Sequence, residues 1–280
     1  MALEDEFGDV IRKARTGLGF EVSDIASRTG IAERDLRSME VYTRRPNASE
    51  VTALATALNL RASALWSLAN DETTAPDGPW TVGDLTVHRM TTHYPSHCYV
   101  VVSPAGSCAI IDPGDDEIVD DLTAYVTGPH RHPVAILITH GHHDHDGGVA
   151  TLQKRLDLPV YVHESDMSNL SAVPKSSLHL HGDGGASTTI DTLQWRALPT
   201  PGHTASSTTW VFPSGTTGAA FCGDTMFAGS AGNGRAGYVR HLTSLRTIIA
   251  ALPPATILYP GHGPATSVAA ELHHNPFLLD

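Results

Sequence analysis

Cysteines, long apolar runs and a secretory signal are scarce or missing in this sequence. Its three cysteines, Cys98, Cys108 and Cys222, are widely spaced and form no Cys-x-x-Cys pair, which excludes a disulfide framework and fits a reducing cytoplasm. No apolar run approaches the roughly 20 residues that a membrane span needs. The acidic start, residues 1–7, lacks the basic n-region of a signal peptide. We therefore expect a cytoplasmic protein without a membrane partner.

The charged residues are few and mostly acidic. A content of 41% hydrophobic and 17% charged residues among 280 is typical of a soluble globular chain. The formal net charge is −12, so any binding of nucleic acid must depend on a local basic patch. All 17 histidines lie beyond residue 75, and imidazole chemistry is therefore concentrated in the second part of the chain.

The first seventy residues have the apolar periodicity of short helices separated by turns. The predicted helices span residues 7–18, 24–28, 32–42, 48–58 and 62–68. Residues 71–79, Asp-Glu-Thr-Thr-Ala-Pro-Asp-Gly-Pro, are polar, contain proline and glycine and have no apolar period, so they are predicted to be a linker. We therefore predict a small all-α domain at 1–70 and a larger domain at 80–280.

The stretch from Ile25 to Glu40 resembles the helix-turn-helix of the Cro/repressor family. The matching pattern is Ile-Ala-x3-Gly-Ile-x4-Leu-x2-Met-Glu, followed by Arg-Arg-Pro at residues 44–46. The resemblance implies that residues 32–42 are a recognition helix and that the protein is a homodimer that reads two half-sites of DNA. The basic candidates for DNA contact are Arg34, Arg37, Arg44 and Arg45. The neighbouring Glu33 and Asp35 would repel phosphate, so a role in dimerisation or partner contact is the alternative.

Beyond residue 80, predicted strands alternate with helices, which indicates an α/β layered fold. The predicted strands are 80–90, 98–102, 107–112, 134–138, 160–163, 193–198, 208–212, 219–221 and 256–259. The predicted helices are 118–126, 148–156 and 242–252.

A dense set of metal-ligand side chains follows one of these strands. Residues 139–148, Thr-His-Gly-His-His-Asp-His-Asp-Gly-Gly, contain four histidines and two aspartates directly after the apolar run at 134–138. Imidazole nitrogens and carboxylate oxygens are ligands of catalytic zinc. A loosely binding His-rich surface tract would have the same composition.

Three other predicted strands also end in a glycine followed by a ligand-type residue. His203 stands in Pro-Gly-His-Thr, Asp224 in Cys-Gly-Asp-Thr and His262 in Pro-Gly-His-Gly. The glycine allows a tight turn that points the next side chain toward the strand-end face. Four strand ends that deliver ligands to one edge are not explained by a surface tract.

Residues 80–280 resemble the metallo-β-lactamase superfamily through His140-x-His142-x-Asp144-His145 together with His203, Asp224 and His262. The resemblance implies an αββα sandwich and two divalent ions, zinc first and iron or manganese as alternatives. One ion would be held by His140, His142 and His203, and the other by Asp144, His145 and His262, with Asp224 bridging them. Asp144 would also orient or deprotonate the attacking water. Two such ions make water a nucleophile near neutral pH, so no serine or cysteine nucleophile is needed.

Further stretches resemble the glyoxalase II branch of that superfamily, namely residues 223–229 and residues 259–267 followed by 274–278. The resemblance implies hydrolysis of a thioester such as a hydroxyacylglutathione. At residues 230–237 the sequence departs from the Gly-Arg-Thr-Asp-like pattern of many relatives, so the thiol carrier stays open. Candidates for binding a substrate carboxylate are Arg235, Tyr238 and Arg240.

Other functions remain open at this point. The chain could be a helix-turn-helix transcription regulator that uses the second domain as a sensor. It could also be a lactonase, or a mononuclear-iron persulfide dioxygenase that needs only His140, His203 and Asp224 as ligands. We expect His143 to point away from the metals and Asp112 to orient a ligand histidine. A surface position is expected for His163, His179, His181 and His241, and a place in the lining of the cleft is the alternative.

Overall fold

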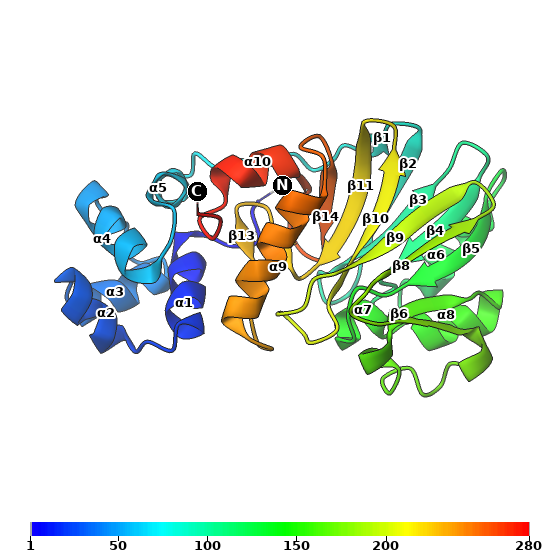
Figure 1. Ribbon diagram of the computed structural model, residues 1–280, viewed down its shortest axis with the longest axis horizontal. Helices are drawn as coiled ribbons and strands as arrows, with labels where there is room; N and C mark the ends of the chain where they lie inside the picture. The colour runs from blue at the N-terminus through cyan, green and yellow to red at the C-terminus, as the bar shows by residue number, and fades with distance from the viewer. Residues whose placement is uncertain (1, 280) are drawn as a thin grey trace.

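A computed structural model describes residues 2–279, and its N-terminal region consists of five helices (Figure 1, blue to cyan). They are α1 (Phe7–Gly17), α2 (Val22–Thr29), α3 (Glu33–Glu40), α4 (Ala48–Leu58) and α5 (Ala62–Ala69). This five-helix prediction is confirmed. Helix α2 begins at a capping box formed by Glu21 and Asp24 and ends at Gly30, whose φ of 73° favours glycine.

The first sheet has seven strands arranged in sequence order. They are β1 (Thr81–Val82), β2 (Leu85–Thr91), β3 (His97–Val102), β4 (Ser107–Ile111), β5 (His132–Leu137), β6 (Val160–His163) and β7 (Leu178–His181). Strands β1 to β4 pair antiparallel, and β4 to β7 pair parallel. The carboxyl ends of β5 and its parallel neighbours therefore lie at one edge of the sheet.

The second sheet has six strands in the order β15-β14-β11-β10-β9-β8. They are β8 (Ala186–Ile190), β9 (Leu193–Pro199), β10 (Thr208–Ser214), β11 (Thr217–Gly223), β14 (Ile257–Pro260) and β15 (Thr266–Ser267). Strands β11 and β14 pair parallel, so their carboxyl ends also lie side by side. A separate hairpin, β12 (Met226–Phe227) and β13 (Ser230–Ala231), follows β11.

The sheets face each other and carry helices on their outer faces (Figure 1). Helices α6 (Val119–Val126) and α8 (Val149–Leu156) cover the first sheet, and α9 (Tyr238–Ala251) and α10 (Val268–His274) cover the second. Side chains alternate along β10: Trp210 and Phe212 pack between the sheets, whereas Val211 packs against the helices. The predicted αββα sandwich is confirmed.

Several predicted elements were wrong or missed. The single strand predicted at 80–90 is a hairpin, because Gly83 with a φ of 62° turns the chain between β1 and β2. Strands β7, β8, β12, β13 and β15 and helix α10 were missed, since they are short. In addition, β7 and β8 are largely exposed and carry no clear apolar alternation. A four-residue helix, α7 (His143–Asp146), lies inside the histidine cluster.

The helical region packs on the second sheet's helices through one continuous apolar core. Phe7 and Leu65 belong to the same buried cluster as Leu245 and Leu278. The backbone N–H of Arg61 donates to the carbonyl oxygen of Pro276 at 2.8 Å. The division of the chain at residues 71–79 stays a prediction. Among residues 2–279, no helix has both the length and the hydropathy to cross a bilayer.

Candidate metal centre

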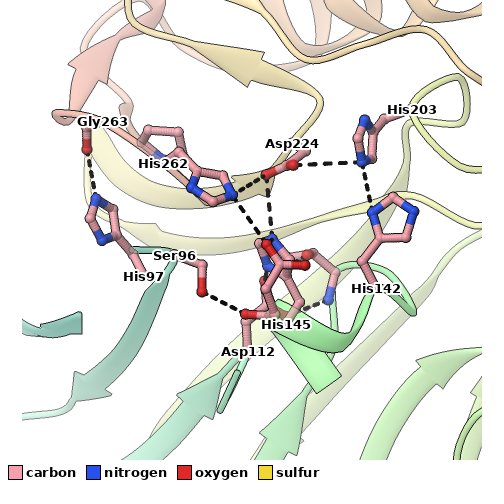
Figure 2. A network of polar contacts seen from close by, with 12 residues as sticks. Ser96, His97, Asp112, His142, His145, His203, Asp224, His262 and Gly263 are labelled. Carbon is pink, nitrogen blue, oxygen red and sulfur yellow. Dashed lines mark hydrogen bonds and ion pairs between the residues drawn. The ribbon is translucent and has the colours of Figure 1, made fainter. Parts of the chain in front are cut away.

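Ligand-type side chains from four strand ends converge at one edge of the sandwich (Figure 2). His140, His142 and the helix α7 follow β5 of the first sheet. His203 follows β9, while Asp224 and His262 follow the parallel pair β11 and β14 of the second sheet. The pattern of a strand, a glycine and a ligand-type residue thus brings distant segments together, as the sequence predicted.

The first cluster consists of His140, His142 and His203. Nδ1 of His142 lies 3.0 Å from Nε2 of His140 and 3.0 Å from Nε2 of His203. The outward nitrogen of each buried histidine has a fixed partner: Nδ1 of His203 donates to the carbonyl oxygen of Asn233 at 2.9 Å, and Nδ1 of His140 lies 3.0 Å from Oγ1 of Thr139. The lone pairs of both Nε2 atoms therefore point inward.

The second cluster consists of Asp144, His145 and His262. Oδ2 of Asp144 lies 3.3 Å from Nε2 of His262 and 3.5 Å from Nε2 of His145. Nδ1 of His145 donates to Oδ2 of Asp112 at 2.9 Å, so its Nε2 also faces inward. Asp112 itself accepts hydrogen bonds from the backbone N–H and the hydroxyl of Thr139, at 2.7 and 2.6 Å.

Asp224 lies between the two clusters. Its Oδ2 is 3.5 Å from Nε2 of His203, whereas its Oδ1 is 3.4 Å from Nε2 of His145 and 3.7 Å from Nε2 of His262. Gly261 makes this approach possible, because a Cβ there would lie 2.4 Å from Oδ1 of Asp224. One carboxylate therefore presents an oxygen to each cluster.

The donor set fits two cations. Nε2 of His145 and Oδ1 of Asp224 are buried and have no hydrogen-bond partner among the described residues. In the first cluster, Nδ1 of His142 lies 3.0 Å from Nε2 of each of the other two histidines. This distance is close to the separation of about 3.3 Å between two ligand atoms of a tetrahedral ion with bonds of ~2.0–2.1 Å. A cation in each cluster would satisfy Nε2 of His145 and Oδ1 of Asp224 together with the other inward nitrogens and oxygens.

The electrostatics of the two clusters differ. Burial lowers the pKa of His140 well below its usual range and that of His203 to about 4, so both rings are neutral and can offer lone pairs. Burial acts in the same direction on His145, but the carboxylates of Asp224 and Asp112 outweigh it and raise its pKa. For Asp224, burial favours the neutral acid, but His145 and the other histidines hold its pKa well below the usual range, and it is ionised.

Comparison with known proteins agrees with the geometry. The profile of the metallo-beta-lactamase superfamily matches residues 91–262, more than half of the chain. The chain belongs to the metallo-beta-lactamase superfamily. Membership places it among metal-dependent hydrolases whose fold binds divalent ions, usually two.

Individual members of the superfamily give the same assignment. The chain is 30% identical over 203 residues to "Probable metallo-hydrolase YqgX" of Bacillus subtilis, covering 65% of this chain and 92% of that protein. It is 37% identical over 154 residues to a hydroxyacylglutathione hydrolase of Alkalilimnicola ehrlichii, covering 55% and 56%. The crystal structure of the BLEG-1 B3 metallo-beta-lactamase superposes with a TM-score of 0.60 at 28% identity, covering 70% of this chain and 100% of that one. The chain spans 55–65% of the length of the hydroxyacylglutathione hydrolases that it matches.

A cavity of about 620 Å³ opens onto the metal centre. Arg235 lines it, whereas the ring of Tyr238 packs on Gly17 and Arg240 is exposed on the first turn of α9. Five residues of the N-terminal region also line it: Glu4, Asp5, Asp9, Arg12 and Lys13. Sequence reasoning missed these five, because the local sequence pattern does not show which residues of this segment face a distant loop.

The expected positions of the remaining histidines were partly wrong. His143 is exposed, as predicted, and His179 is exposed too. His163, His181 and His241 are buried instead. His181 packs edge-on against Trp210 with ring centroids 5.2 Å apart, and the backbone of His241 packs closely on Gly202. These imidazoles belong to the core, which a single histidine in the sequence does not reveal.

The four arginines proposed to contact DNA fall into two pairs. The side chains of Arg34 and Arg37 on α3 are 88% and 65% exposed, with Asp35 and Glu33 at 3.5 and 3.4 Å. The other two also lie in ion pairs: Arg44, 33% exposed, binds Glu50 at 2.6 Å, and Arg45, 71% exposed, binds Asp71.

Proposed function

We propose that this protein is a dinuclear metallohydrolase that cleaves a small, hydrophilic thioester, as a hydroxyacylglutathione hydrolase does. The observation that carries the proposal is the position of Asp224, which offers one oxygen to each of two three-residue clusters. The proposed ligands of the first ion are His140, His142 and His203. Those of the second are Asp144, His145 and His262. Zinc is the proposed metal, because imidazole nitrogens and carboxylate oxygens are its usual ligands in catalytic sites.

When bound, the ions supply Lewis acidity that polarises a carbonyl group and makes water a nucleophile near neutral pH. The protein orients the side chains of the proposed ligands. Asp112, Thr139 and the carbonyl of Asn233 hold the outward nitrogens of the ligand histidines, which fixes their tautomers and ring directions.

Asp144 is the proposed proton acceptor. Burial favours its neutral form, but the hydrogen bond from His262 and the charge of His145 lower its pKa, so it is ionised at neutral pH. Its carboxylate lines the cavity, where it can orient a water molecule and take its proton. The thiolate of a thioester is a good leaving group, so the proposal needs no separate general acid.

The lining of the cavity supports a hydrophilic substrate. Fourteen of the described residues line it, and Phe227 is the only apolar one among them. The guanidinium of Arg235 makes no hydrogen bond or ion pair with any residue between 2 and 279, and it is the proposed partner of a substrate carboxylate. Tyr238 and Arg240, the other candidates from the sequence, lie elsewhere, as described above. A long acyl chain would find little apolar surface here.

A substrate panel tests this proposal. Zinc-loaded protein is assayed with S-lactoylglutathione, with a short acyl thioester of a different thiol, and with a homoserine lactone. Thioester hydrolysis well above lactone hydrolysis is expected. A preference for the lactone would replace the thioesterase by a lactonase. Oxygen uptake with glutathione persulfide by the iron-loaded protein, without hydrolysis, would replace it by a mononuclear-iron dioxygenase.

DNA binding through α3 is a second candidate function, which would make the chain a regulator with a metallohydrolase-fold sensor. The exposed guanidiniums of Arg34 and Arg37 favour it, and their acidic neighbours oppose it. Gel shifts with upstream DNA at two salt concentrations test it, because phosphate contacts make affinity fall with salt. Arg34→Ala with Arg37→Ala should abolish the shift, and Arg155→Ala on α8 is the control. No shift for the wild-type protein would leave the helical region with a role in dimerisation or partner contact.

A further inference from the structure

A buried ion pair ties the N-terminal region to the loop beside the metal centre. Lys13, on α1, is 11% exposed, and its ammonium group binds the carboxylate of Asp5, which is 7% exposed. The same ammonium donates to the carbonyl oxygen of Ala231 at 2.8 Å. Asp5 also accepts a hydrogen bond from the hydroxyl of Ser230 at 2.6 Å. Both residues of the short strand β13 are thus held by residues more than 200 positions away.

Strand β13 leads directly to the residue that orients His203. Two positions after Ala231, the carbonyl oxygen of Asn233 accepts the hydrogen bond from Nδ1 of His203 at 2.9 Å. Between them lies Gly232, where a Cβ would stand only 1.8 Å from the carbonyl oxygen of Asp224. Because Gly232 has no room to move toward Asp224, a displacement of β13 is passed on to Asn233.

Lys13 also contacts the other strand of the hairpin. Its Nζ lies 5.0 Å from the centre of the Phe227 ring on β12. That ring in turn packs edge-on against His262, with centroids 6.0 Å apart. In Figure 1, β13 lies between α1 and the second sheet. The ammonium group of Lys13 therefore contacts both strands of the hairpin. One strand contacts His262, a proposed ligand of the second ion, and the other leads to the partner of His203, a proposed ligand of the first.

We propose that Lys13 is a positioning residue of the metal centre. It holds β13 so that the Asn233 carbonyl receives the Nδ1–H of His203 and Nε2 of His203 points at the first ion. The inference rests on the proposed role of His203 as a ligand. Loss of the group that orients a ligand histidine typically weakens metal binding ~10–100-fold. Lys13 acts through one further contact, so we expect the lower end of that range.

The test measures zinc affinity without substrate. The variant carries Lys13→Met together with Asp5→Asn, which removes both charges and leaves no unpaired buried ion. Lys13→Arg is the conservative variant, and Lys154→Met, at an exposed position of α8, is the matched control. Zinc dissociation constants come from competition with a chromophoric chelator, and the visible spectrum of the Co(II)-loaded protein reports the geometry of the site.

We expect one zinc equivalent to bind about tenfold more weakly in the double variant, with an altered cobalt spectrum. Lys13→Arg and Lys154→Met should behave as wild type. A lower unfolding temperature with wild-type zinc affinity and cobalt spectrum would overturn the proposal and make the pair purely structural. If the double variant does not fold, Ser230→Ala, which removes only the hydroxyl donor to Asp5, decides by the same two measurements. A wild-type protein that binds zinc but cleaves no thioester counts against the proposed function alone.

Discussion

Nδ1 of His145 donates a hydrogen bond to Oδ2 of Asp112 at 2.9 Å, and both side chains are buried, at 0% and 3% exposure. The same carboxylate accepts two hydrogen bonds from Thr139, the residue that precedes His140. Asp112 therefore connects the two clusters, because it binds His145 directly and His140 through Thr139. It is not a proposed ligand itself, but it fixes the ring directions of these two proposed ligands.

Asp112→Asn should weaken metal binding. An amide replaces one acceptor oxygen by an NH2 group, which meets donors at His145 and Thr139 and cannot satisfy them. We expect zinc affinity to fall ~10–100-fold, measured by chelator competition. Asp157→Asn is the control, because Asp157 is exposed at the end of α8 and asparagine tolerates its φ of 52°. Equal affinities of the two variants would show that Asp112 does not orient His145.

Gly261→Ala should abolish most of the activity through a steric effect. The added Cβ would lie 2.4 Å from Oδ1 of Asp224 and 2.5 Å from Cε1 of His145, so both side chains must shift. A shift of this size can reduce kcat/KM on the order of 100-fold. Gly184→Ala is the matched control, since no neighbouring heavy atom would lie within 4 Å of a Cβ at Gly184. Near-wild-type turnover of Gly261→Ala would show that Asp224 is not needed at its observed position.

Most of the metal centre was predictable because its signal is local. His203, Asp224 and His262 each follow a strand by a few residues, and the parallel pairing of β11 with β14 brings two of those ends together. A strand that ends in glycine and a ligand-type residue can be recognised without a structure. The ligand roles themselves stay predictions that the experiments above address.

The wall of the cavity and the burial of single histidines were not predictable in this way. Lys13 and Ala231 are 218 positions apart, and no periodicity links them. His163 and His241 lie in segments whose local pattern does not distinguish a core imidazole from a surface one. Contacts between distant segments depend on how the helical region docks, which the sequence pattern does not encode.

Glu271 should make stability depend on pH. Burial raises its pKa to about 7, although Thr266, Asn275 and the backbone N–H of Gly229 donate to it. The folded-state pKa is above the unfolded one, so its stabilising contribution is complete below about pH 4.5 and is lost as pH rises through 7. The loss of this contribution lowers the free energy of unfolding by roughly 3 kcal/mol over that pH range.

Urea unfolding of the metal-free protein at pH 5 and pH 8 measures this effect. The wild-type free energy of unfolding should fall relative to that of Glu271→Gln as pH rises, because glutamine has no proton to lose. Glu72→Gln, at an exposed position, should track the wild type at both pH values. If the free energies of unfolding of wild type and Glu271→Gln differ by the same amount at pH 5 and at pH 8, the raised pKa of Glu271 is contradicted.

The most direct test of the dinuclear centre is the metal content per chain, measured by mass spectrometry on purified wild-type protein and on two histidine variants. His142→Ala removes a proposed ligand, while His143→Ala changes the exposed neighbour. About two zinc ions per chain are predicted for wild type and His143→Ala, and about one for His142→Ala, with thioester hydrolysis lost in His142→Ala. One iron or no tightly bound metal in the wild type, or two zinc ions retained in His142→Ala, would contradict the account.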